Sequence, residues 1–538
     1  MNRRSTFIFL VALISVATLA FLSGVNADVT VGHASNITSG PAPCKSAVCQ
    51  VQRSVQSFAS KFTVKQVLVA IIIVLTSIAA HQHYVLSQKK GNLPGPSFVP
   101  PFFGMLFQLI LTPFTFYQNQ EKYGPVSWTS IMNKFVLFVT DAETTRQVFK
   151  EENAKLYLSI TAKQILTEKA IPYIEGTAHR QLRKQLLPLF TIRALSSYLP
   201  IQDAIIKEHI DLWFKEGNTI NARTKCRDLN MAISAGVFVG QKTPADVREE
   251  IARNFFVMNE GFLCFPIDLP GTTLRKAVNA RIRLVEIFTD IIEDSRKRMS
   301  EGEQPQSLID LWVEYYLGCD ESERDELSND TIIYTLLSFM FASQDAMSSS
   351  LVWVVALLAE HPDVLARVRE EQFRLRPNGE ANTLETMRKA FYTRQVVNEI
   401  LRFRPPAVMV PHENIEDIVI GDNVVVPKGT MILPSIWSAH FDKEGFKDAH
   451  KFDPERFNDE RKEEITCAKH YLVFGAGPHY CIGRELAKNQ IELFLTHMAM
   501  HVEWEHLPTP GGDEIIFGPT IFPKDGCNAS IKRRVYAA

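Results

Sequence analysis

The sequence predicts a mainly α-helical protein with a small β region and an N-terminal membrane anchor. Apolar residues recur at helical spacing through most of the chain after residue 140. β-branched and aromatic residues alternate over residues 126 to 140, which predicts two strands joined around Asn133. Two long apolar runs lie before residue 90, and no Pro-, Gly- or Ser-rich linker interrupts the chain beyond residue 101. One large domain is therefore expected over residues 102 to 538.

The charge and the cysteines narrow the class of protein. The formal net charge of the 538 residues is −2, which argues against a nucleic-acid-binding protein. Of the eight cysteines, the six beyond residue 100 are scattered and form no Cys-x-x-Cys pair. This usage predicts a reducing compartment for the large domain.

The first 27 residues have the composition of a signal peptide or of a first membrane anchor. Two arginines precede an apolar run, and small residues follow it. Residues 28 to 61 are polar and irregular, and we expect them to form a short lumenal segment. They contain an N-glycosylation acceptor pattern at Asn36. Cys44 and Cys49 could pair if this segment lies in a lumen.

A second apolar run predicts a transmembrane helix over residues 62 to 88. Its length approaches the ~20 residues that a bilayer needs, and Lys89 and Lys90 follow it directly. Because cytoplasmic flanks are enriched in lysine and arginine, the large domain is expected in the cytoplasm. A buried core helix is the alternative. Residues 89 to 101 are rich in proline and predict a stiff hinge between anchor and body.

One cysteine lies in a loop rich in glycine and proline, between Phe474 and Gly483. Glycines allow a tight turn and a close approach of the backbone to a flat ligand. Good helix formers follow Gly483, so Cys481 precedes a helix N-terminus, whose positive end favours a thiolate. A thiolate in a glycine-lined pocket is a good axial ligand for haem iron. A buried cysteine beside a turn is the alternative.

The pattern Phe-x-x-Gly-x-x-x-Cys-x-Gly of residues 474 to 483 resembles the haem-binding loop of the cytochrome P450 family. The resemblance extends from about residue 90 to the C-terminus, with five motifs in the same order. It implies the fold of that family and a haem b whose iron is bound by Cys481. It also implies haem contacts from Phe474, Gly475 and Gly483.

Four further side chains fall where the family binds the haem propionates. His179 and Arg183 are four residues apart on one predicted helix face, where the family usually has Trp and Arg. His412 falls where an Arg is common, and His479 where Arg or His is found. Histidine can donate to a carboxylate. A solvated basic face is the alternative for the helix that carries His179.

A buried charge network is implied for three residues. Glu399 and Arg402 are three apart on one predicted helix face, and Arg456 follows in the segment Asp-Pro-Glu-Arg-Phe. In isolation such a pair is ordinary surface charge. In the family the three residues pair with one another, as buried charges must. We assign them to folding and haem retention rather than to chemistry.

The longest apolar helical pattern of the large domain covers residues 331 to 360 and contains an acid and several serines. Such serines can bend a helix, and a local opening would admit O2 and water. In the family an acid followed by a threonine serves proton delivery here. Asp345 keeps the acid, and Ala346 replaces the threonine. The resemblance assigns catalysis to Ala342, Asp345 and Ser348, with ordered water as the preferred proton carrier; a kinked core helix is the alternative.

Residues 341 to 350 and 474 to 481 resemble the sterol C22-desaturases of fungi, plants and protists. That resemblance implies an enzyme of the endoplasmic reticulum membrane, in contact with membrane lipid. It would use O2 and electrons from an NADPH-cytochrome reductase to place a double bond in a sterol side chain. Apolar residues that are candidates to line the sterol pocket, and could equally be plain core, are Phe339, Phe341, Met409, Val410 and Ile521.

Three alternatives fit the same sequence. A sterol 14α-demethylase or another lipid hydroxylase shares the fold, although demethylases usually keep the threonine that Ala346 replaces. Loss of that threonine also fits an isomerase or dehydratase that uses haem without O2, and Asp345 argues against it. A non-catalytic haem-binding membrane protein is the third, and the presence of Cys481 with the Glu399–Arg402 pair argues against it.

Overall fold

The computed structural model describes residues 64–320, 328–512, 514–518 and 520–534. The expectations for a signal peptide or first anchor, a lumenal segment, Asn36, Cys44 and Cys49 lie outside the described residues. The chain divides into two compact units, Met1–Gln88 and Lys89–Ala538. The described residues of the first unit belong to a single helix, α3 (Val64–Lys90).

Helix α3 is consistent with the predicted anchor. Its apolar side chains are exposed, among them Leu68, Ile72 and Ile73. By length and composition, two helices of the described residues could cross a membrane, Leu68–Lys90 and Asn329–Glu360. The second is mostly buried inside the protein, so it is a core helix, whereas the first is almost entirely uncovered.

A mixed five-stranded sheet contains the predicted β region. Its strands lie in the order β1 (Val126–Ile131), β2 (Lys134–Val139), β8 (Met431–Pro434), β5 (His412–Asn414) and β3 (Ala154–Leu156). β1 and β2 are antiparallel, and Met132 and Asn133 between them have φ of 49° and 61°. Two successive residues with positive φ are typical of a tight hairpin turn. The prediction of two strands around Asn133 is confirmed.

Of three smaller sheets, one joins segments that are distant in sequence. β12 (Asn528–Arg533) lies between β4 (Thr219–Asn221) and β9 (Val502–His506). Two antiparallel pairs complete the set: β6 (Ile418–Ile420) with β7 (Val424–Val426), and β10 (Ile515–Phe517) with β11 (Ile521–Pro523).

Helices form most of the second unit. They follow the chain as α4 (Leu106–Leu111), α5 (Pro113–Glu121), α6 (Ala142–Lys150), α7 (Ile160–Leu166), η1 (Ile171–Tyr173), α8 (Gly176–Leu186), η2 (Leu187–Phe190), α9 (Ile192–Glu216), α10 (Ala222–Phe238), α11 (Ala245–Glu260), α12 (Thr273–Ser300), α13 (Leu308–Leu317), α15 (Asn329–Glu360), α16 (Pro362–Leu375), α17 (Leu384–Lys389), α18 (Phe391–Phe403), α19 (Ile436–His440), η3 (Pro454–Phe457), α20 (Glu463–Thr466), η4 (Gly477–His479) and α21 (Arg484–His501).

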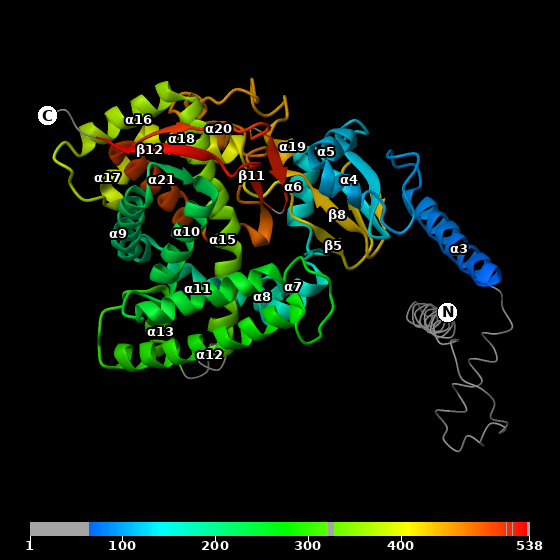
Figure 1. The fold of residues 1–538 in the computed structure, drawn as a ribbon, viewed down its shortest axis with the longest axis horizontal. Coiled ribbons are helices and arrows are strands. Elements are labelled where there is room, and N and C mark those ends of the chain that lie inside the picture. Colours follow the sequence, from blue (N-terminus) through cyan, green and yellow to red (C-terminus); the bar gives the residue numbers. More distant parts are fainter. Residues whose placement is uncertain (1–63, 321–327, 513, 519, 535–538) are drawn as a thin grey trace, which may run out of the picture. The chain divides into compact units, whose positions relative to one another are not determined.

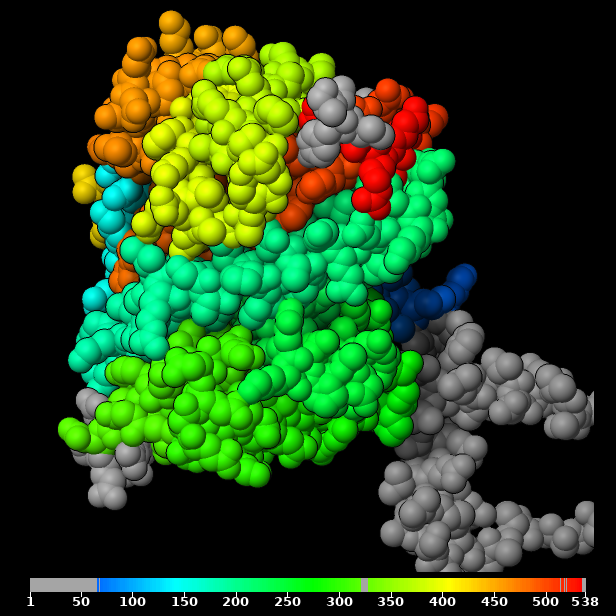
Figure 2. All heavy atoms as spheres, turned by 90° about the vertical axis from the view of Figure 1, so that its left-hand side faces the viewer, coloured from blue at the N-terminus to red at the C-terminus, as the bar shows by residue number. Residues whose placement is uncertain are grey.

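Helix α15 is the central element of this unit. Figure 1 shows it between α10 on one side and the sheet with β5 and β8 on the other. It begins at the N-cap Ser328, whose hydroxyl accepts from the Thr331 backbone N–H at 3.2 Å, and Pro362 opens the next helix. A helix that is apolar on nearly all sides belongs in a core. In Figure 2, α9 and α10 cross the middle of one face of the unit, α11 to α13 lie below them, and α16 and α17 lie above.

Candidate functional site

The loop before α21 is a tight turn that presents Cys481. The Cys481 backbone N–H donates to the Phe474 carbonyl at 3.0 Å and closes the loop. Gly475 and Gly477 have φ of +72° and +71°, in the left-handed region that favours glycine. A Cβ on Gly477 would lie 2.4 Å from the carbonyl oxygen of Phe149 on α6. Glycine at 477 is therefore required by the close approach of α6 to the loop.

The Cys481 thiol is exposed within a pocket that the protein otherwise encloses. Burial raises the pKa of the Cys481 thiol above its ordinary value, while the Gly483 backbone N–H, Arg183 and Arg484 act in the opposite direction. The helix N-terminus alone therefore does not produce the thiolate expected from the sequence. Coordination to a metal deprotonates a thiol outright, so a bound haem iron would supply what the helix terminus does not.

The pocket has a volume of about 450 Å³, which is within the range of small-molecule sites. A Cβ added at Gly475 or Gly483 would meet no atom within 4 Å, so the loop leaves an open cradle beside the sulfur. A flat, largely apolar group such as haem fits this cradle. Helices α8, α10, α15 and α21 supply much of the wall, with residues that include Leu182, Leu186, Ile233, Val237, Phe339, Ala342, Ala346, Met347, Leu486, Ala487 and Ile491.

The four predicted propionate-binding residues all line this pocket. The rings of His179 and His479 lie 4.1 Å apart, and His479 Nε2 is 3.6 Å from a Glu175 oxygen. The Arg183 Nη2 donates to the Tyr480 carbonyl at 2.6 Å. These side chains can hold carboxylates by hydrogen bonds and charge.

Burial changes the charge of two of these histidines. It lowers the pKa of His179 and of His412 to about 4 in each case. Both rings are therefore neutral near pH 7. The His412 Nδ1 lies 2.7 Å from the Val410 carbonyl, which fixes that nitrogen as the protonated one in a neutral ring. His412 then faces the pocket region with Nε2 as an acceptor, or as a donor only when it is protonated.

Glu399, Arg402 and Arg456 meet as the sequence predicted. Arg402 donates from Nε and Nη2 to the two oxygens of Glu399 at 2.6 and 2.8 Å, and Arg456 Nε lies 3.4 Å from Glu399 Oε1. All three side chains are completely buried. The Asp453 backbone N–H donates to Glu399 Oε1 at 2.8 Å. This set of contacts ties α18 to η3, next to the segment that leads to the cysteine loop.

The polar residues of α15 are arranged differently from the expectation. Ala342 and Ala346 line the pocket, but Asp345 and Ser348 are not among its described lining residues. Ser348 is buried, and its hydroxyl donates to the Gln344 carbonyl of its own helix at 2.5 Å. A serine with its hydroxyl on the preceding turn is a poor proton carrier to a pocket. A path from half-buried Asp345 to the pocket needs an intervening water.

Of the five predicted pocket residues, Phe339 and Val410 lie in the wall. The other three do not belong to its described lining. Phe341 packs against Phe262 with ring centroids 4.4 Å apart. Ile521 is fully buried, and Met409 forms a β-bridge with Ser435. Alternation of faces along the helix and strands turns these three side chains toward the core.

Sequence reasoning missed the wall that α8 and α10 contribute. Leu182 and Leu186 are four residues apart, and so are Ile233 and Val237, so each pair lies on one helix face. That spacing was available in the sequence. It could not be distinguished from ordinary core packing, because an apolar helix face that packs into the core has the same spacing.

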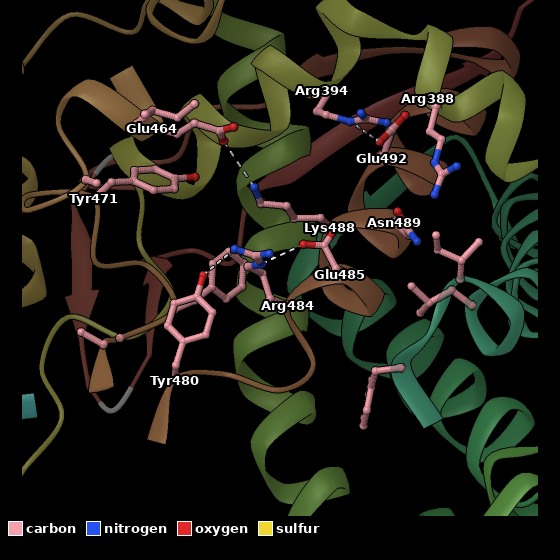
Figure 3. Close-up of a pocket in the computed structure, with 18 of the residues that line it drawn as sticks. Arg388, Arg394, Glu464, Tyr471, Tyr480, Arg484, Glu485, Lys488, Asn489 and Glu492 are labelled. Atoms are coloured by element: carbon pink, nitrogen blue, oxygen red, sulfur yellow. Dashed lines mark hydrogen bonds and ion pairs between the residues drawn. The ribbon is translucent and has the colours of Figure 1, made fainter. Parts of the chain in front are cut away.

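A second pocket, of about 760 Å³, lies on the other side of the cysteine loop. Phe474, Gly475, Ala476 and Tyr480 line both pockets. Figure 3 shows its charged side chains: Arg484 donates to the Tyr480 hydroxyl at 2.7 Å and pairs with Glu485 at 2.7 Å. Five cations line this pocket against three acids, so it is electropositive; the cations are Arg146, Arg388, Arg394, Arg484 and Lys488.

Comparison with known proteins agrees with this geometry. The family model "Cytochrome P450" matches residues 93–519. The chain is 72% identical to a probable cytochrome P450 524A1 of Dictyostelium discoideum, over 98% of each chain. It is 34% identical to cytochrome P450 710A2 of Arabidopsis thaliana, over 83% of this chain and 92% of that one. It is 32% identical to the C-22 sterol desaturase erg5 of Aspergillus fumigatus, over 81% and 88%.

Solved structures show the same fold. Retinoic acid bound cyanobacterial CYP120A1 is 27% identical and has a TM-score of 0.71, with 82% of this chain and 99% of that chain covered. The cytochrome P450DA heme domain, at 18% identity, has a TM-score of 0.70 over 82% and 99%. With a cysteine loop, a cradle for haem and a buried charge network of the expected kind, the chain belongs to the cytochrome P450 family and is a haem-thiolate monooxygenase.

Proposed function

We propose that this enzyme is a sterol C22-desaturase. The observation that carries the proposal is the wall of α15, where Ala342 and Ala346 face the pocket and Ala346 directly follows Asp345. The α15 serines in the same wall, Ser338, Ser343 and Ser350, each donate to a carbonyl of their own helix. The similarity to two fungal proteins named C-22 sterol desaturase, at 32% identity each, supports the same substrate class. A mainly apolar wall suits a sterol side chain.

The reaction balances as side chain –CH2–CH2– plus O2, NADPH and H⁺, giving –CH=CH–, two waters and NADP⁺. Haem, when bound, activates O2 and removes hydrogen; the chain supplies binding, orientation and protons. Cys481 would ligate the iron, and Phe474, Gly475 and Gly483 would form the cradle. Arg183, His179 and His479 would hold the haem carboxylates, and His412 would do so only when it is protonated, because in the neutral ring its Nε2 is an acceptor.

Asp345 is the proton source in this proposal, and water carries its protons. Hydroxyls that could replace the missing threonine are already engaged: Ser348 bonds to Gln344 O, Ser349 to Ile521 O at 2.5 Å, and Ser350 to Ala346 O at 2.9 Å. A pocket wall without a free hydroxyl near Ala346 favours hydrogen removal over retention of oxygen as an alcohol.

The electropositive pocket beside the cysteine loop is the proposed docking face for an NADPH-cytochrome reductase. Steering by opposite charge raises encounter rates and is screened by salt. Arg180 and Lys184 on the nearby α8 are exposed and extend this face. Charge reversal at both should slow the first electron transfer at low salt. If the reduction rate changes neither with salt nor with these substitutions, the face is an ordinary solvated surface and not a docking site.

The proposed location is the endoplasmic reticulum membrane, with α3 as the anchor and the large unit in the cytoplasm. The lysines Lys89 and Lys90 at the end of α3 support this orientation. Protease added to sealed microsomes should digest the large unit. Protection of that unit would overturn the orientation.

The decisive experiment expresses the chain in a host that lacks C22-desaturation and identifies sterols by mass spectrometry. A product two hydrogens lighter, with the new bond between C22 and C23 and formed only with NADPH and reductase, is expected. Loss of the 14α-methyl group, or a side-chain alcohol as the main product, would instead identify a demethylase or a hydroxylase. Product without O2 would point to an isomerase or dehydratase.

A further inference from the structure

A cluster of three buried amides joins two walls of the Cys481 pocket through a third helix. Asn230 lies on α10, Gln344 on α15 and Gln490 on α21, and their exposed fractions are 0%, 1% and 5%. Gln490 itself lines the pocket, as does Ser343, the neighbour of Gln344. A buried amide destabilises the fold unless its polar atoms form hydrogen bonds, so these three side chains need partners inside the protein.

The three side chains form one continuous chain of hydrogen bonds. The Gln490 Nε2 donates to Asn230 Oδ1 at 3.0 Å. The Asn230 Nδ2 donates toward α15, at 3.2 Å to Gln344 Oε1 and at 3.3 Å to the Ser343 carbonyl. The Gln344 Nε2 donates back to α10, at the Arg227 carbonyl, at 3.0 Å. Every polar side-chain atom of Asn230 and Gln344 therefore has a partner.

The part of α15 that these amides hold is unbroken helix and contains the buried residues Ser348, Ser349 and Ser350. The Ser348 hydroxyl bonds to the Gln344 carbonyl and the Ser350 hydroxyl to the Ala346 carbonyl. Hydroxyls that bond to the preceding turn compete with the main chain and bend helices. Asn230 of α10 donates a hydrogen bond to this part of α15, at the Ser343 carbonyl.

We propose that Asn230, Gln344 and Gln490 act as an amide clamp that sets the spacing between α15 and α21 across the pocket. α21 begins at Arg484, directly after the cysteine loop, and α15 carries Ala342 and Ala346 in the facing wall. A fully satisfied buried network rigidifies a site and specifies one arrangement. The three amides are positioning residues: they fix how much room lies beside the iron ligand, whatever the substrate is.

The test compares two iron ligands of different bulk, imidazole and 4-phenylimidazole, by titration of the purified holoenzyme and the shift of its Soret band. Asn230→Leu, Gln344→Met and Gln490→Met remove the amides and nearly preserve volume. The ratio of the two dissociation constants should change by about fivefold or more, the size of one net hydrogen bond. The double variant Asn230→Leu/Gln490→Met should change it no more than the larger single variant, because both break one chain of bonds.

Gln372→Met is the matched control. Gln372 is a buried amide on α16 that donates to Thr393 at 2.8 Å and accepts from Arg376, outside the lining of the pocket. It should lower the melting temperature and leave the ratio unchanged. An unchanged ratio in haem-loaded clamp variants, additive effects in the double variant, or an equal change in Gln372→Met would each overturn the clamp. Failure of all clamp variants to load haem, when Gln372→Met loads it, would assign the cluster to folding alone.

Discussion

Two regions of this enzyme bury polar side chains on helices beside the pocket. They offset the free-energy cost of desolvating those side chains in different ways. Around Glu399 on α18, full charges meet opposite charges: Arg402 donates twice to Glu399, and Arg456 approaches it at 3.4 Å. In the middle of α15, neutral hydroxyls meet carbonyls, and Ser348 and Ser350 bond to their own helix.

The difference has a consequence for how each region responds to change. Removal of one partner from a buried ion pair leaves an uncompensated charge and is strongly destabilising. Removal of a hydroxyl that bonds to its own helix leaves a carbonyl that still has its main-chain partner, so the cost is small. The Glu399 region therefore belongs to structure, whereas α15 can vary its polar residues and so vary the chemistry.

Cys481 lines the pocket together with Ala342 and Ala346 of α15, and its loss should have the largest effect. Cys481→Ala removes the iron ligand, so we expect complete loss of the Soret band typical of thiolate ligation in the reduced carbon monoxide complex. Cys467→Ala is the matched control, because Cys467 donates to the Gly445 carbonyl at 2.9 Å and is not part of the pocket lining. A band that survives in Cys481→Ala would remove this residue from the site.

Glu399→Gln tests the charged region. It preserves shape but leaves the buried guanidinium of Arg402 without a carboxylate and that of Arg456 with Glu463 alone, so the free energy of unfolding should fall by about 3–5 kcal/mol. Denaturant unfolding of the haem-loaded protein measures the change. Glu385→Gln is the control, since Glu385 forms an exposed pair with Lys389 at 2.7 Å and should matter little. Similar losses in both variants would contradict the comparison.

Sequence reasoning succeeded where both partners belong to recognisable motifs. The cysteine loop and His179, Arg183, His412 and His479 line one pocket, and Glu399, Arg402 and Arg456 pair with one another. The hairpin at Asn133 was predicted because its turn and alternation are local signals. The helical class followed from periodicity alone.

Prediction from the sequence failed for residues whose neighbours are set by tertiary packing. Nothing in the sequence around Phe341 or Ile521 says that Phe262 packs against the first or that α15 contacts the second, so both were expected in the pocket and lie outside its described lining. The local sequence around Cys481 also does not show that burial acts on the pKa of its thiol more strongly than the helix N-terminus does. The amides Asn230 and Gln490 are 260 residues apart, and no local pattern joins them.

Asp345→Asn tests the α15 region. If Asp345 delivers protons through water, sterol product per haem should fall at least ~100-fold, the lower range for general acid–base steps. Haem content and sterol binding should remain normal. Ser348→Ala is the matched control, because its hydroxyl is committed to Gln344, and it should retain most activity. Near-normal alkene formation by Asp345→Asn would show that Asp345 does not deliver protons and has a structural role only.

The smallest effect is expected from His440, which joins the charged region to the cysteine loop. Its Nδ1 donates to the Arg402 carbonyl at 3.0 Å, and its Nε2 accepts from the Leu472 backbone N–H at 3.0 Å, so the ring is neutral. Burial, and then the charge of Arg402, lower the pKa of His440 to about 3. In the unfolded chain the pKa of histidine is about 6.5. Between these values the unfolded state binds the extra proton, so stability is lost as pH falls.

That proton should be visible in the pH dependence of unfolding. The loss is at most ~1.4 kcal/mol per pH unit for one group, or about 2 kcal/mol between pH 6.5 and 5. His440→Gln should have a lower free energy of unfolding at pH 7. Its free energy of unfolding should also fall less steeply with pH, by the contribution of about one proton. Urea unfolding at several pH values measures both. Burial also lowers the pKa of His179, His412 and His501. These histidines contribute equally to the pH dependence of unfolding in both proteins, so their contributions cancel in the difference. Equal slopes would mean that His440 is protonated in the fold, and that the charged region tolerates a third buried cation beside Arg402 and Arg456.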